Sequence, residues 1–117
     1  MATQARSGDR GGPDEQLVSE IVRRIVDSAR PLRIILFGSA ARGEMGPNSD
    51  LDILLVVPDG CHRRRTAQQA YKSLRALGVS KDVVVVTEGD VRKYSKNPSL
   101  VLDPALREGK EIYRAGG

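Results

Sequence analysis

The chain has 117 residues, of which 39% are hydrophobic and 29% are charged, a balance typical of one soluble globular domain. Three tyrosines and one phenylalanine are its only aromatic residues, so aliphatic side chains must form the core. A single cysteine excludes an internal disulfide and a thiolate metal cluster, and no apolar run approaches the roughly 18 residues that span a bilayer. We therefore expect a cytoplasmic protein without a membrane segment.

The net charge of +4 and the sequence pI near 9.6 are compatible with an anionic partner. Part of the surplus lies in residues 1–16, a polar leader without the hydrophobic segment of a signal peptide, which we expect to be a disordered tail. Another part lies in Arg63, Arg64 and Arg65, and such a run more often forms a solvated face than a binding site. Charge alone therefore gives generic nucleic-acid binding little support.

The segment after the leader has helical periodicity. Apolar residues recur one turn apart over residues 17–26, with charged residues between them, which predicts an amphipathic helix. Asp14 and Glu15 place negative charge where a helix begins, and Pro31 is expected to end it. Residues 32–37, LRIILF, then form an apolar run that predicts a buried strand.

A second strand and a second helix are predicted next. The strand covers residues 50–57 and is closed by the turn PDG at 58–60. The helix that follows ends at Gly78, which suits the C′ cap position. Its apolar face is made of Ala67, Ala70, Tyr71, Leu74 and Leu77.

The last third of the chain contains a continuous β-branched run, DVVVVT, at residues 82–87. Such a run is typical of a strand that is covered on both faces, so we expect it to be central in its sheet. Thr87 and Asp90 resemble a helix N-cap and predict a short helix through Tyr94. A last short helix from Asp103-Pro104 to Gly109 and a terminal strand EIYR complete the expected order.

These elements predict an α/β (α+β) fold, a small mixed β-sheet flanked by helices. Residues that could bind a metal ion or a phosphate gather at the strand ends. Asp50 and Asp52 are two positions apart at the start of a strand, so their carboxylates lie on one face, about 7 Å apart along the chain. Asp82 begins the next apolar run and could add a third carboxylate, and three carboxylates could hold two Mg²⁺ ions. The alternative is an ordinary turn terminus, with Asp82 paired to Lys81.

Gly38 and Ser39 directly follow the first predicted strand and precede AARG, a segment able to begin a helix. A glycine permits close approach of the backbone, a serine offers a hydroxyl, and a helix start offers free N–H groups, all of which suit phosphate oxygens. An ordinary strand-to-helix turn would look the same. Together with the aspartates, however, the pair predicts a nucleotide site.

Gly38-Ser39, ten intervening residues and Asp50-Leu51-Asp52 resemble the G-S-x10-D-x-D signature of the minimal nucleotidyltransferases (MNT), the smallest members of the DNA polymerase β-like superfamily. Arg42-Gly43 and Ser49 match its fuller form, and Asp82 matches its third carboxylate. The similarity continues through LREGKEIY at residues 106–113. We therefore expect one nucleotidyltransferase domain over residues 17–113, with the polymerase-β-like fold.

The resemblance implies a role for each matching residue. Asp50 and Asp52 would ligate both Mg²⁺ ions, and Asp82 would complete the site for the ion that activates the acceptor hydroxyl. Ser39 and the backbone at Gly38 would hold the triphosphate of ATP. Arg42 would support this segment or offset phosphate charge, although a surface or helix-bracing arginine is an equal alternative.

The resemblance also implies a partner. Many MNT proteins bind an all-helical HEPN protein, often a toxin ribonuclease, and some transfer AMP from ATP to a tyrosine of that toxin and so act as antitoxins. Two alternatives stay open: a binding module that masks a HEPN partner sterically, and an enzyme that modifies a small-molecule hydroxyl such as that of an aminoglycoside. In the last case a partner or a second copy of the chain would complete the pocket.

Several other residues are given structural roles. Cys61 and His62 lack further ligands at a usable spacing, so we expect them to be loop residues rather than metal ligands. Tyr94 and Tyr113 are expected to pack, as is Tyr71 within the stripe described above.

Overall fold

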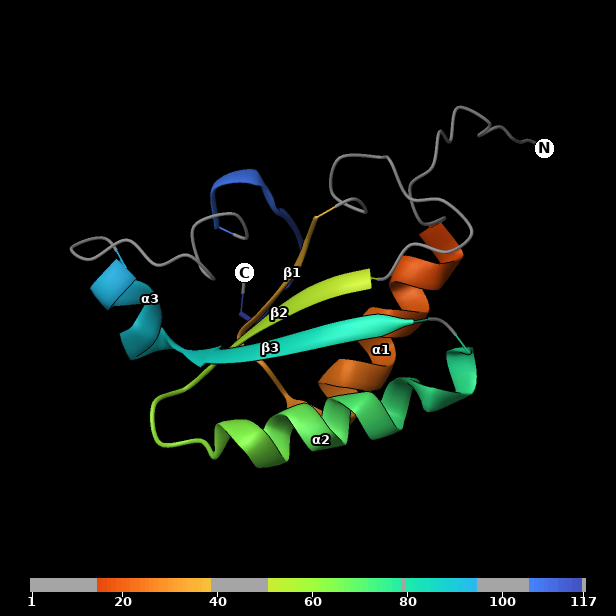
Figure 1. Ribbon diagram of the computed structural model, residues 1–117, viewed down its shortest axis with the longest axis horizontal. Helices are drawn as coiled ribbons and strands as arrows, with labels where there is room; N and C mark the ends of the chain where they lie inside the picture. The colour runs from red at the N-terminus through yellow and green to blue at the C-terminus, as the bar shows by residue number, and fades with distance from the viewer. Residues whose placement is uncertain (1–14, 39–50, 79, 95–105, 117) are drawn as a thin grey trace.

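The computed structural model describes residues 15–38, 51–78, 80–94 and 106–116, which form one mixed sheet with helices on both faces (Figure 1). Predictions that concern Asp14, Ser39, Arg42, Asp50, Asp103 and Pro104 lie outside the described residues.

Within the described ranges, the sheet has four strands in the order β3-β2-β1-β4. β1 (Arg33–Phe37) lies between β2 (Leu51–Val57) and β4 (Lys110–Arg114) and runs antiparallel to both. β2 and β3 (Lys81–Thr87) are parallel, because the helix between them returns the chain to the same end of the sheet. The predicted mixed sheet is therefore confirmed.

Among the described residues, three α-helices of seven residues or more accompany the sheet. α1 (Glu15–Ala29) and α2 (Arg63–Leu74), which continues as the 3₁₀ turn η2 (Arg75–Leu77), pack against the same face and against each other. α3 (Glu88–Tyr94) follows β3 at the far end of the sheet (Figure 1) and contributes to the opposite face. All three confirm predicted helices, and residues 106–108 are helical just before Gly109, as expected.

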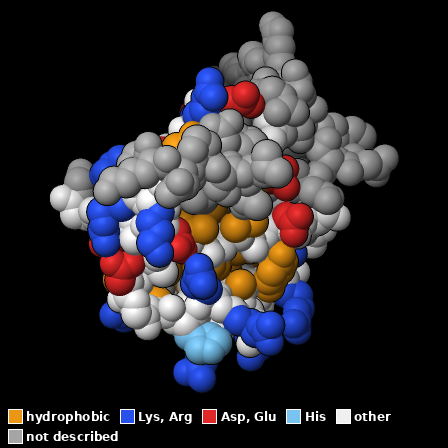
Figure 2. Space-filling model, turned by 60° about the vertical axis from the view of Figure 1, so that its left-hand side comes forward, with side chains coloured by type: hydrophobic (Ala, Val, Ile, Leu, Met, Phe, Trp, Pro, Cys, Tyr) orange, Lys and Arg blue, Asp and Glu red, His pale blue; other side chains and the backbone are white. Residues whose placement is uncertain are grey.

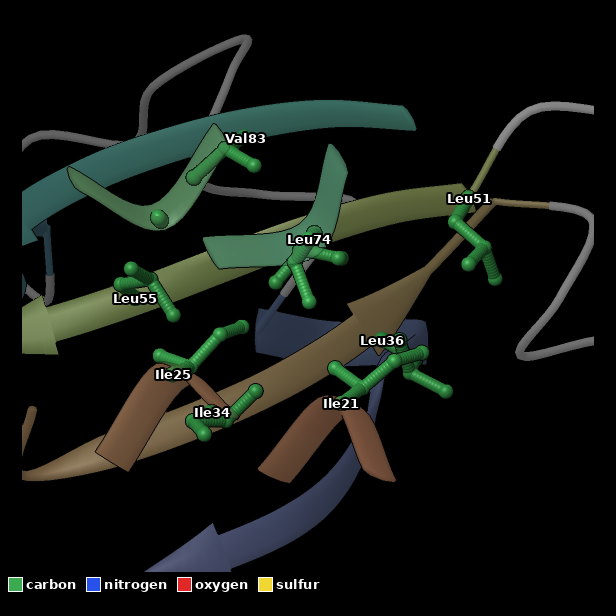
Figure 3. Close-up of a cluster of buried hydrophobic side chains, with 10 residues drawn as sticks. Ile21, Ile25, Ile34, Leu36, Leu51, Leu55, Leu74 and Val83 are labelled. Atoms are coloured by element: carbon green, nitrogen blue, oxygen red, sulfur yellow. The ribbon is translucent and has the colours of Figure 1, made fainter. Parts of the chain in front are cut away.

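Alternation of side chains along the strands divides the core into two layers. The larger layer fills the space between the sheet and helices α1 and α2 (Figure 3), and the smaller one lies on the other face beside α3. The larger layer includes Ile21, Ile25, Ile34, Leu36, Leu51, Leu55 and Leu74. The smaller layer is Ile35, Leu54, Val56 and Val86, with Phe37, Val84, Val91, Tyr94 and Leu106 packed against it. The expected packing of Tyr94 and Tyr113 is confirmed, because the latter packs against the larger layer.

The predicted ends of the elements are supported by specific contacts. Arg30 follows α1 with a positive φ of 49°, and Pro31 comes directly after it. Gly78 takes the left-handed conformation at φ 67° and ψ 14° after η2, as expected for a C-terminal cap. The Thr87 hydroxyl accepts from the Asp90 N–H at 3.1 Å, and the Asp90 carboxylate accepts from the Thr87 N–H at 3.0 Å. The predicted N-terminal cap of α3 is thus a reciprocal capping box.

Two expectations are corrected. Residues 82–87 form a strand covered on both faces, but within the described sheet β3 is an outer strand rather than a central one. Its β-branched composition reflects contacts with α2 on one face and α3 on the other, which do not require a strand neighbour on each side. Tyr71 is 37% exposed instead of packing in the stripe of α2, whose buried positions are Thr66, Ala70 and Leu74.

Candidate active site

Two of the three predicted carboxylates lie side by side at the amino ends of β2 and β3. Asp52 and Asp82 are register partners in the parallel ladder, and neighbouring strands are about 4.8 Å apart. Both residues share the face of the smaller core layer, because Leu54 and Val84, two positions along each strand, belong to it. The expectation that these carboxylates come from neighbouring strands is therefore supported by the register.

Gly38 brings the end of β1 against the carboxylate of Asp52. Phe37 pairs with Asp52 across the antiparallel ladder, and the chain turns at Gly38 with φ +73°. A Cβ at Gly38 would stand 2.2 Å from Oδ2 of Asp52 and 3.2 Å from its Cγ. The carboxylate thus occupies the space in which any other residue would place its side chain, and only glycine allows this approach.

The side chain of Tyr71 reaches Asp82 from α2. Its hydroxyl lies 3.3 Å from Oδ1 of Asp82, to which it donates, and it accepts the Val83 N–H at 2.9 Å. Since that N–H donates to the phenol, it points away from β2, toward the outer edge of the sheet. Tyr71 therefore crosses the edge of β3 and contacts both backbone and carboxylate.

Tyr71 is the site residue that the sequence predictions missed. Its place in a helical apolar stripe predicts burial, and no local pattern links it to an aspartate eleven residues later. The one available signal is chemical, because a tyrosine carries a polar group beyond an apolar ring and places that group at a boundary. It also lines a groove along the outer surface of α2, with Arg65, Gln68, Gln69, Lys72 and Arg75.

The structure therefore brings together Gly38, Asp52 and Asp82 of the six predicted site residues. The other three, Ser39, Arg42 and Asp50, lie outside the described residues, and their roles stay predictions. Over the described ranges, no group of three His, Cys, Asp or Glu side chains is close enough to hold a metal ion. Two carboxylates on one face are nevertheless the oxygen donors that a hard divalent cation prefers, and Asp50 would be the third.

The opposite end of the sheet has a different, structural role. Cys61 is exposed, and His62 is the N-cap of α2, where its Nδ1 accepts the Arg65 N–H at 3.2 Å. Figure 2 shows the histidine with Lys and Arg side chains around it. Arg63 forms an ion pair with Asp90 at 2.9 Å, which joins the start of α2 to the start of α3. The expectation that Cys61 and His62 are loop residues is consistent with this arrangement.

Carboxylates at this end have lowered pKa values with identifiable causes. The Gly89 N–H donates to Asp59 at 2.8 Å, and this bond, followed by the one from Arg92, lowers the pKa of Asp59. The Thr87 N–H and then the charge of Arg63 lower the pKa of Asp90. These contacts order the turn and the helix caps, far along the strands from Asp52 and Asp82.

A small mixed sheet flanked by helices, with two carboxylates beside a glycine turn, is what the polymerase-β-like nucleotidyltransferase fold leads one to expect, and comparison with known proteins agrees with that fold. The nucleotidyltransferase domain family matches residues 16–107, and the chain belongs to this family. Among curated proteins, none matches the chain. No helix within the described ranges is long and apolar enough to cross a membrane.

Solved structures with the same fold include toxin–antitoxin complexes. A chain from a toxin–antitoxin structure with AMP-PNP is 26% identical, with a TM-score of 0.59 over 85% of this chain and 74% of that chain. A second match, at 24% identity and a TM-score of 0.54, comes from a tri-AMPylated Shewanella oneidensis HEPN toxin in complex with an MNT antitoxin and covers 86% and 73% of the two chains. A nucleotidyltransferase-like protein of Sulfolobus solfataricus matches at 22% identity and a TM-score of 0.58, over 86% and 79%.

Proposed function

We propose that this protein is a Mg²⁺-dependent nucleotidyltransferase that transfers AMP from ATP to a hydroxyl group, and that the acceptor is a tyrosine of a HEPN toxin which it thereby neutralises as an antitoxin. One observation carries the proposal: Asp52 and Asp82 are register partners on neighbouring strands, and the Asp52 carboxylate lies against the backbone of Gly38. That arrangement puts a candidate metal site next to a candidate phosphate site.

The residues present fit divalent cations. Asp52 and Asp82 offer oxygen ligands on one face of the sheet, and Asp50, two positions before Asp52, is expected to add a third. Bound Mg²⁺ would supply positive charge that offsets the triphosphate and acidifies the acceptor hydroxyl. The proposed ligands are all carboxylates, with no sulfur or imidazole that would favour a softer metal.

The proposed reaction is an in-line displacement at phosphorus. The acceptor oxygen forms a bond to the α-phosphorus, the bond from that phosphorus to the bridging oxygen breaks, and pyrophosphate leaves with the electron pair. Gly38 and Ser39 hold the triphosphate on the β1 side, and Arg42 offsets part of its charge. Asp82 would serve on the acceptor side as a metal ligand, and the hydroxyl proton would pass to water.

The acceptor and the partner are proposed from relatives. A 26% identical chain comes from a toxin–antitoxin structure that contains AMP-PNP, an ATP analogue, and another match comes from a complex that contains an AMPylated HEPN toxin. The motif of this chain over residues 38–52, which resembles the MNT signature, supports the same reading. ATP is accordingly the proposed donor, and a HEPN protein the proposed partner.

Transfer of label tests the proposal. The protein is incubated with Mg²⁺ and α-labelled ATP, with and without the protein encoded beside it, and we expect label on a tyrosine of that neighbour, which the proposal identifies as a HEPN protein. Asp52→Asn should reduce the rate by more than about 100-fold, since it alters a proposed direct metal ligand. Asp27→Asn, which neutralises an exposed carboxylate on α1 instead, should leave the rate unchanged.

The second candidate is a binding module that masks its partner sterically. A 26% identical chain comes from a toxin–antitoxin structure, and binding to a toxin is all that masking requires. A stable complex that forms without label, neutralises the partner and survives Asp52→Asn would establish masking and refute transfer. Label on an aminoglycoside in place of a protein would identify a small-molecule enzyme.

A further inference from the structure

Tyr71 and Asp82 form a contact between α2 and the outer strand of the sheet that no sequence motif describes. The phenol hydroxyl donates to Oδ1 of Asp82 at 3.3 Å and accepts from the Val83 N–H at 2.9 Å. A hydroxyl has one hydrogen to donate, so the acceptance from Val83 leaves that hydrogen directed at the carboxylate. The two hydrogen bonds together fix the direction of the Tyr71 O–H bond.

Asp82 needs such a support more than Asp52 does. Asp52 is half-buried on the most buried strand and lies against Gly38, whereas Asp82 is exposed on a strand that has one neighbour in the described sheet. An exposed aspartate can adopt several rotamers, and each would carry its oxygens to a different position. A hydrogen bond to one oxygen selects one rotamer and leaves the second oxygen for a ligand.

The backbone of Tyr71 is held in place by the packing of α2. It lies on α2 between Ala70 and Leu74, which are 0% and 1% exposed and anchor that part of the helix in the larger core layer. Tyr71 also lines the groove on the outer surface of α2. A rigid ring on an anchored helix can therefore hold the Asp82 carboxylate in one position.

We propose that Tyr71 is a positioning residue, which holds the Asp82 carboxylate in the orientation required for the metal ion on the acceptor side. The inference rests on the proposed function, since it assigns the support of one of its metal ligands. Tyr71 itself touches no reacting atom in this scheme. It acts through Asp82 alone, so its effect should disappear when Asp82 can no longer bind a metal.

Two measurements on Tyr71→Phe test the proposal. The first is the affinity for Mn²⁺ in the presence of AMP-PNP, followed by electron paramagnetic resonance, which requires no turnover. We expect about a tenfold loss of Mn²⁺ affinity, the usual effect of removing a hydrogen bond that orients a metal ligand. The second is AMP transfer, in which kcat should fall about tenfold while KM for ATP changes little, because the triphosphate is held on the Gly38 side.

Two further variants separate positioning from stability. Tyr113→Phe removes a tyrosine hydroxyl on β4, away from α2 and β3, and should change neither measurement. In an Asp82→Asn background, Tyr71→Phe should cause no additional loss of Mn²⁺ affinity, whereas a general structural defect would lower affinity there as well.

The outcomes are distinct. Equal Mn²⁺ affinity in Tyr71→Phe and the unaltered protein overturns the positioning role, as does an additional loss in the Asp82→Asn background. If the unaltered protein binds Mn²⁺ with AMP-PNP but labels no acceptor, the transferase proposal fails, while the positioning role is still decided by affinity. An unaltered protein that binds no Mn²⁺ overturns both.

Discussion

Gly38→Ala is the sharpest test of the contact between the β1 turn and the Asp52 carboxylate. Alanine at φ +73° is expected to cost about 1–2 kcal/mol of stability, the usual strain of a left-handed L-residue. In addition, Oδ2 of Asp52 lies 2.2 Å from the new Cβ and must retreat by roughly 1 Å to reach ordinary contact. A displacement of about 1 Å in a catalytic group can reduce a rate by about 100-fold.

The chain provides a matched control at Gly78, where φ is +67° and no atom lies within 4 Å of an added Cβ. Gly78→Ala should therefore show a similar loss of stability without the displaced carboxylate. Urea unfolding measures stability, and Mn²⁺ affinity with AMP-PNP and the rate of AMP transfer measure the site. If both variants reduce these two quantities equally, or if Gly38→Ala leaves them unchanged, the assignment of Gly38 and Asp52 to one site is wrong.

Further predictions concern stability, pH and the paired carboxylates. Thr87→Ala removes one bond of the capping box of α3 and should cost about 1 kcal/mol in urea unfolding, with no change in AMP transfer. The pKa of Asp90 is lowered by the Thr87 N–H and then by Arg63. The contribution of Asp90 to stability is therefore present above the ordinary aspartate pKa of about 3.9 and is lost as the pH falls through the lower folded value. Asp90→Asn should flatten that part of a plot of unfolding free energy against pH. Leu55→Ala, at a side chain that is 0% exposed, should cost about 2–5 kcal/mol by urea unfolding. Asp82→Asn should abolish AMP transfer yet leave the unfolding free energy unchanged or up to about 1 kcal/mol higher, because it removes a like charge opposite Asp52; a marked loss of stability would contradict this.

The sequence predicts the elements of this fold better than their arrangement. Periodicity locates α1 and β2 to within a few residues, and Thr87 with Asp90 predicts the start of α3, because these signals are local. The position of β3 at the outer side of the described sheet depends on which strand pairs with which, and burial alone does not encode it. A valine run covered by helices on both faces looks the same in a central strand and in an outer one.

The candidate site divides in the same way. Gly38, Asp52 and Asp82 could be predicted because a motif spacing and a strand start mark them. Their mutual placement follows from the β2–β3 register, which pairs Asp52 with Asp82. Tyr71 could not be predicted, since its contact with Asp82 depends on how α2 crosses the outer strand.

The pair Asp52 and Asp82 makes a functional interpretation stronger than a structural one. Aspartate is disfavoured in strands, and like charges that oppose each other across a ladder are destabilising. The next partners along the same ladder, Ile53 with Val83 and Leu54 with Val84, show that apolar pairs are readily accommodated here. Hydrophobic or opposite-charge residues at positions 52 and 82 would give a more stable sheet, so stability does not explain the two carboxylates. A bound cation, as proposed, would turn this repulsion into shared ligation, and the proposed phosphate-binding turn at Gly38 would then have a reason to lie beside it.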